Sequence, residues 1–156
     1  MARFLAAIMM VCVIASTARA DQTTPSLREE VQQFVREYVN AQNTLNAAAI
    51  MEMISRMPEG YSVWEDKITR GWDAIRNETE QSAGAKGKLI ISIGIVDVES
   101  LGKDYALAVT PVVATLKTDQ GDVQIRGAMS LILVKSAGKW KVFHEHTSIK
   151  LPTVEK

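Results

Sequence analysis

Two hydrophobic periods divide the chain. Between residues 26 and 82 apolar side chains recur every three or four positions, whereas from residue 88 onward they alternate or run continuously, as in strands. The first pattern predicts a helix from Ser26, where Ser26-x-x-Glu29 forms a capping box, and a second helix over residues 47–56. A short strand is predicted over residues 61–64, and a third helix takes over within residues 69–82.

The second half of the chain predicts four consecutive strands over residues 89–98, 105–116, 123–134 and 139–148. Short turn sequences join them, so we expect an antiparallel meander. Pro111 lacks a backbone N–H, which predicts a bulge, a bend or an edge position there. The predicted fold class is α+β, with three N-terminal helices packed on a curved, mainly antiparallel sheet.

The last strand contains both histidines of the chain. Strict alternation would place on one face Trp140, Val142, His144, His146 and Ser148. Glu145 would then point to the opposite face. A polar row that follows an aromatic anchor is typical of a ligand pocket, although a hydrogen-bonded network in the core would give the same pattern.

Three side chains are the first candidates for catalysis. His144 and His146 have the residue type of a general base, and Tyr38, on the apolar stripe of the first helix, could donate a hydrogen bond to an oxyanion. Equally, all three can be structural residues with satisfied polar atoms. Candidate ligand-binding residues on the other elements are Trp64, Trp72, Arg126, Ser130 and Ser148.

No metal or cofactor is predicted. A zinc site needs three or four ligands, and two histidines without a cysteine beside them do not supply that set. The single cysteine, Cys12, lies in the N-terminal segment, so the rest of the chain has neither a disulfide nor a thiol nucleophile.

The first 20 residues predict a secretory signal peptide. Arg3 gives a positive start, residues 4–14 are apolar, and Ala18-Arg19-Ala20 predicts cleavage after Ala20. The apolar run is too short for a membrane span, for which about 20 residues are needed. We therefore expect a secreted or periplasmic domain over residues 21–156, without a membrane span.

Charge argues against a nucleic-acid partner. The 156-residue chain has 18 basic and 18 acidic residues, and loss of Arg3 and Arg19 with the signal peptide leaves a slightly acidic domain. No basic stripe remains that could neutralise a row of phosphates.

The ending Gly138-Lys139-Trp140 followed by His144-x-His146-x-Ser148 resembles the SnoaL-like branch of the nuclear transport factor 2-like superfamily, which is related to ketosteroid isomerase. The helix break over residues 41–46, Gly71 and Ser130 add to the resemblance. It implies a cone-shaped α+β fold with an apolar pocket, and dimers that form through the sheet.

Three hypotheses for function follow. The first is a homodimeric domain that binds a small apolar or amphipathic ligand without catalysis. The second is a cofactor-independent isomerase, dehydratase or cyclase that acts on a hydrophobic carbonyl compound. The third is a protein-interaction module of the cell envelope that uses the open sheet face.

Overall fold

A computed structural model describes residues 26–84, 89–118 and 121–150. The predicted signal peptide and Cys12 lie outside these ranges. The helices are α1 (Leu27–Asn43), α2 (Ala47–Met53) and α3 (Trp72–Ala83), and the strands are β1 (Tyr61–Trp64), β2 (Lys67–Arg70), β3 (Leu89–Ile93), β4 (Asp97–Ser100), β5 (Tyr105–Thr118), β6 (Gly121–Ser136) and β7 (Lys139–Lys150). Within the described ranges, no helix combines the length and the apolar character that a membrane crossing needs.

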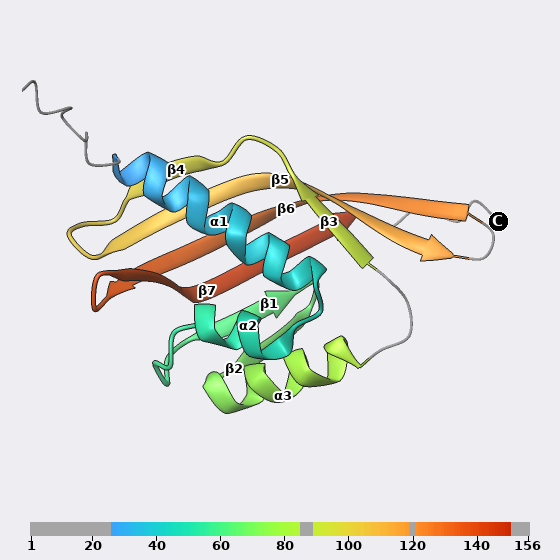
Figure 1. The fold of residues 1–156 in the computed structure, drawn as a ribbon, viewed down its shortest axis with the longest axis horizontal. Coiled ribbons are helices and arrows are strands. Elements are labelled where there is room, and N and C mark those ends of the chain that lie inside the picture. Colours follow the sequence, from blue (N-terminus) through green and yellow to red (C-terminus); the bar gives the residue numbers. More distant parts are fainter. Residues whose placement is uncertain (1–25, 85–88, 119–120, 151–156) are drawn as a thin grey trace, which may run out of the picture.

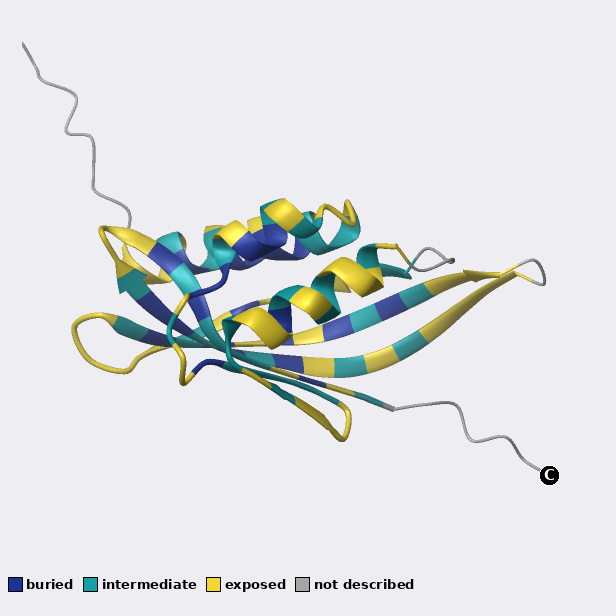
Figure 2. Ribbon diagram, turned by 90° about the horizontal axis from the view of Figure 1, so that it is seen from below, coloured by how far each residue is buried: buried dark blue, intermediate teal, exposed yellow. Residues whose placement is uncertain are grey.

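One curled sheet contains all of these strands. Its order is β2-β1-β7-β6-β5-β3, with β4 also paired to β5. Neighbouring strands are antiparallel, except that β1 runs parallel to β7. The helices cover one face of the sheet, and α1 crosses it diagonally (Figures 1 and 2). The α+β prediction and the antiparallel meander are confirmed.

The core lies between the helices and the inner face of the sheet. The capping box that starts α1 is present, since Ser26 Oγ accepts from the N–H of Glu29 and the Glu29 carboxylate accepts from the N–H of Ser26. The helix then buries one stripe against the central strands, as its spacing predicts. The most deeply buried members of this core are Val31, Val35, Tyr38, Ala106, Ala108, Met129, Leu131 and Leu133.

Two strand predictions are wrong. The single strand expected over residues 89–98 is divided into β3 and β4, because the chain leaves the ladder opposite Pro111. Pro111 has no N–H to donate, and its carbonyl accepts from the N–H of Gly94 at 3.0 Å. A side chain at Gly94 would lie 2.7 Å from the proline ring. The second error is β2, whose last two residues, Thr69 and Arg70, were predicted to belong to the third helix.

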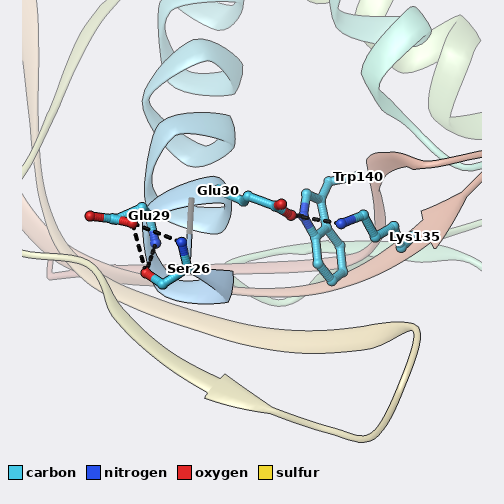
Figure 3. A network of polar contacts seen from close by, with 5 residues as sticks. All are labelled: Ser26, Glu29, Glu30, Lys135 and Trp140. Carbon is cyan, nitrogen blue, oxygen red and sulfur yellow. Dashed lines mark hydrogen bonds and ion pairs between the residues drawn. The ribbon is translucent and has the colours of Figure 1, made fainter. Parts of the chain in front are cut away.

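A polar network fixes α1 to the β6–β7 hairpin (Figure 3). The Glu30 carboxylate accepts from Lys135 Nζ at 2.7 Å and from Trp140 Nε1 at 3.1 Å. The hydrogen bond from Lys135, followed by that from Trp140, holds the pKa of Glu30 below its usual value. The first turn of α1 is thereby held over the end of the sheet.

Replacing Glu30 by glutamine is expected to lower the free energy of unfolding at neutral pH by about 1 kcal/mol. Because the folded-state pKa of Glu30 is depressed, its contribution is complete above the ordinary value of 4.5 and is lost as the pH falls through the lower folded value. Urea unfolding at several pH values measures the difference. Glu37→Gln, at an exposed site on the same helix, is the control. If the free energies of unfolding of Glu30→Gln and the parent protein differed by the same amount at pH 2 as at neutral pH, this account would be contradicted.

Candidate ligand-binding cavity

A β-bulge at Phe143 reverses the faces of the last strand. Val142 pairs with Leu133, whereas His144 already pairs with Ile132, so Phe143 is the extra residue. Beyond the bulge, Glu145 turns toward the helices, and His144 turns to the outer face of the sheet. The prediction that the histidines share a face with Val142 is therefore wrong, because one inserted residue shifts every later side chain to the other face.

The helices and the inner face of the sheet line an open cavity of about 310 Å³, here called the central cavity. Its wall is mostly apolar, and every layer of the fold contributes to it. Its apolar and aromatic lining includes Tyr38, Leu45, Ile50, Ile54, Trp64, Ile75, Leu89, Ile91 and Val142. The polar lining is formed by Gln42, Ser62, Glu78, Thr79, Ser82 and Glu145.

Glu145 is the polar centre of this cavity. Its Oε2 accepts a hydrogen bond from the Tyr38 hydroxyl at 2.6 Å. Its Oε1 accepts longer bonds from Thr147 Oγ1 at 3.3 Å and from Gln42 Nε2 at 3.4 Å. Three neutral donors from α1 and β7 thus converge on one carboxyl group. Tyr38 is fully buried, and Glu145 is half-buried where it borders the cavity, so the pair lies largely away from bulk water.

Burial dominates the ionisation of this pair. It raises the pKa of Glu145 above 4.5, although the hydrogen bonds from Tyr38, Gln42 and Thr147 and the charge of His144 act in the opposite direction. Burial also raises the pKa of Tyr38 well above 10, and the neighbouring carboxylate raises it further. Tyr38 therefore stays protonated as a donor, and the raised pKa of Glu145 is of the kind that is common at functional sites.

A second carboxylate, Glu78, lies at the wall formed by α3. It accepts hydrogen bonds from Lys67 Nζ at 2.6 Å and from the Thr69 hydroxyl, both on β2. Burial would raise the pKa of Glu78, but these two hydrogen bonds outweigh it, and the pKa lies below the usual value. Glu78 is therefore an ionised group that already has its own cation.

The structure separates the residues singled out in the sequence. Tyr38 and Trp64 line the central cavity. His144 packs on Tyr61, with ring centroids 4.3 Å apart and Nδ1 3.0 Å from the Tyr61 carbonyl oxygen. Trp72 is not part of the cavity wall, and its ring contacts the guanidinium groups of Arg56 and Arg76. The other four residues do not line the cavity either. Three of them are exposed, namely His146, Ser148 and Arg126. Ser130, on β6, is half-buried and pairs with His146 of β7.

Sequence reasoning missed Glu145, Gln42 and Glu78. Glu145 was assigned to the face away from the pocket, because strict alternation ignored the bulge. One signal was present, since a glutamate in the middle of a strand that also carries apolar residues is seldom buried without a specific partner. The partner, Tyr38, is 107 residues away along the chain.

Comparison with known proteins places this arrangement in a family. The SnoaL-like domain matches residues 31–152, which is most of the chain. The chain belongs to the SnoaL-like domain family. The match spans α1 to β7 and so includes both Tyr38 and Glu145. No match was found among the curated proteins.

Solved structures show that this SnoaL-like domain has the nuclear transport factor 2-like fold. A protein of that superfamily from Salmonella enterica superposes with a TM-score of 0.70 at 17% identity, over 81% of this chain and 92% of that one. A protein named Aln2 from a Streptomyces species gives 0.68 at 15% identity, over 80% and 91%. An NTF-2 like protein from Shewanella oneidensis gives 0.60 at 20% identity, over 76% and 96%.

Proposed function

We propose that this SnoaL-like domain binds a small, largely apolar molecule in the central cavity, with the Glu145–Tyr38 pair at its polar end. The observation that carries the proposal is a carboxyl group with a raised pKa in the wall of an apolar cavity. The volume of about 310 Å³ is at the lower end of the range for small-molecule sites. A few polar groups that converge within an apolar wall are the usual arrangement for orienting such a ligand.

Filling the cavity is expected to abolish binding. Thr79 lies one turn after Ile75 on the inner face of α3, so Thr79→Trp places an indole in the cavity. Native mass spectrometry of protein purified gently from its own host should find a stoichiometric small molecule on the parent protein. It should also find that molecule on Asn77→Trp, at an exposed site of the same helix, but not on Thr79→Trp. A parent protein that carries nothing, or a Thr79→Trp variant that keeps the molecule, would contradict the proposal.

A second candidate function is a cofactor-independent isomerase, dehydratase or cyclase. The raised pKa of Glu145 supports it, because a carboxyl whose pKa lies above its ordinary value is a better proton acceptor than an unperturbed one. In this proposal Glu145 takes the role of the base that the sequence assigned to His144 or His146. The molecule recovered from the protein is then incubated with it in D₂O. If the molecule takes up deuterium or loses water in the presence of the parent protein, but does neither in the presence of Glu145→Gln, the protein is an enzyme. If the molecule stays unchanged with the parent protein, binding alone is supported.

We further propose a homodimer that forms through the outer face of the sheet. This face carries the apolar side chain of Val109 on β5, which is 36% exposed. Sedimentation velocity should report a dimer for the parent and a monomer for Val109→Glu. Ile95→Glu, in the loop between β3 and β4, is the control. A monomeric parent would contradict the dimer, and co-purification of a different envelope protein would favour the interaction module instead.

Secretion is also proposed, on the pattern of residues 1–20. The amino terminus of protein taken from the native host tests it. A start at Asp21 is expected, and a protein that retains residues 1–20 would remove the assignment to the envelope.

A further inference from the structure

We infer that the preferred ligand of the central cavity is a hydrophobic amine, whose ammonium group pairs with the Glu145 carboxylate. The inference rests on the proposed function, since it specifies the chemistry of the ligand that this site takes. Three features of the cavity wall carry it: the sign of its charges, the direction of its hydrogen bonds and the absence of a cation beside Glu145 among the described residues.

The charges of the wall are acidic. Among the described residues that line the cavity there are two glutamates, Glu78 and Glu145, and no lysine, arginine or histidine. Glu78 is matched by Lys67 at 2.6 Å. Glu145 has only neutral donors, and the nearby His144 points to the outer face, where its Nδ1 contacts the Tyr61 carbonyl. Buried carboxylates normally have a cationic partner, so the cation for Glu145 is missing from the described chain.

The three donors that reach Glu145 are already used. The Tyr38 hydroxyl donates to Oε2, and Gln42 Nε2 and Thr147 Oγ1 donate to Oε1. On the opposite wall, the Thr79 hydroxyl donates to the Ile75 carbonyl. The carbonyl oxygen of the Gln42 side chain is buried and has no partner in the described part of the chain. Beside Glu145, a head group therefore meets the carboxylate and this carbonyl as acceptors, and the hydroxyl of Ser62, opposite Glu145 on β1, is the neutral neighbour.

An ammonium group supplies both the missing positive charge and the hydrogen-bond donors that these acceptors need. It has three donors and no acceptor, so it can bond Glu145 and Gln42 Oε1 together while it supplies the missing positive charge. The apolar wall takes the rest of the molecule. A carboxylate or phosphate head group would lie beside the Glu145 carboxylate and would gain no cation from the described wall, so such ligands are expected to bind more weakly.

A matched series of compounds tests the inference. Isothermal titration calorimetry of the mature protein at pH 7 compares 4-phenylbutylamine, 4-phenylbutan-1-ol and 4-phenylbutyrate, which differ only in the head group. The amine is expected to bind at least about tenfold more tightly than the alcohol, as for a charge-assisted hydrogen bond in place of a neutral one, and the carboxylate more weakly still. In Glu145→Gln the amine should lose its advantage over the alcohol. In Glu99→Gln, at an exposed site on β4, the advantage should remain.

The outcomes separate this inference from the proposed function. An alcohol or carboxylate that binds the parent protein as tightly as the amine overturns the inference and leaves a ligand-binding cavity in place. An amine preference that persists in Glu145→Gln also overturns it, because the carboxylate would then not be the partner. If none of the three compounds binds, the inference fails, and the native mass of the protein from its host decides the proposed function by itself.

Discussion

Replacing Tyr38 by alanine is expected to lower the free energy of unfolding by about 3–5 kcal/mol, the range for removal of a fully buried aromatic side chain. The ring of Tyr38 is 1% exposed and lies in the core between α1 and the sheet. The hydroxyl also supplies the shortest hydrogen bond to Glu145. Alanine therefore removes packing and leaves the buried carboxyl without its best donor. Urea unfolding followed by circular dichroism measures the change.

Tyr38→Phe separates these two contributions. It keeps the ring and removes only the hydroxyl, so the expected loss is smaller, about 1–3 kcal/mol, from a buried acceptor left without its donor. One of the hydrogen bonds that lower the pKa of Glu145 would then be missing, so burial should raise this pKa further. If Tyr38→Phe were as damaging as Tyr38→Ala, packing would not be the main role of the ring. If Tyr38→Phe had no effect, the hydrogen bond to Glu145 would be unimportant.

Gly127→Ala is expected to destabilise the protein by at least about 2 kcal/mol, as overpacking against backbone does. Gly127 lies on β6 opposite Ile149 on β7, where the strands bring a carbonyl very close. A Cβ at this position would lie 2.1 Å from the Ser148 carbonyl oxygen and 3.0 Å from Ile149 Cα. Both of these atoms belong to the backbone of β7, so a rearrangement of one side chain cannot relieve the contact. Pairing of the last residues of β7 should therefore be lost or displaced.

Gly84→Ala is the matched control, since its φ of −86° suits any residue and its nearest neighbour would be 3.6 Å from the new Cβ. A change between zero and a gain of about 1 kcal/mol is expected there. Thermal unfolding and amide hydrogen exchange of residues 145–149 check the pair of variants. Equal stability of Gly127→Ala and Gly84→Ala would show that β6 and β7 are not packed as described.

The elements of the fold were accessible from the sequence because their signals are local. The capping box at Ser26 and the three-to-four spacing of Val31, Val35 and Tyr38 determine α1 without reference to the rest of the chain. The long strands β5 and β6 follow from apolar runs joined by turn residues. Pro111 marked the place where the ladder is interrupted, although the interruption falls on the neighbouring strand and not on β5 itself.

The site was not accessible in the same way. The faces of β7 depend on whether one residue, Phe143, is inserted into the ladder, and nothing in its local sequence announces the bulge. Because the period of a strand is two, that single residue exchanged His144 and His146 for Glu145 at the inner face. The contact between Glu145 and Tyr38 joins two distant segments, and only the packing of α1 on the sheet brings them together.

The measurement that tests this account most directly is an NMR pH titration of the Glu145 side-chain carboxyl carbon, assigned by its disappearance in Glu145→Gln. A carboxyl turned into the central cavity by the bulge should titrate with a midpoint above the ordinary value of 4.5, and higher still in Tyr38→Phe. A midpoint at or below 4.5 that is unchanged by Tyr38→Phe would place Glu145 in water, on the outer face of the sheet. The cavity would then lack the polar centre on which the proposed function depends.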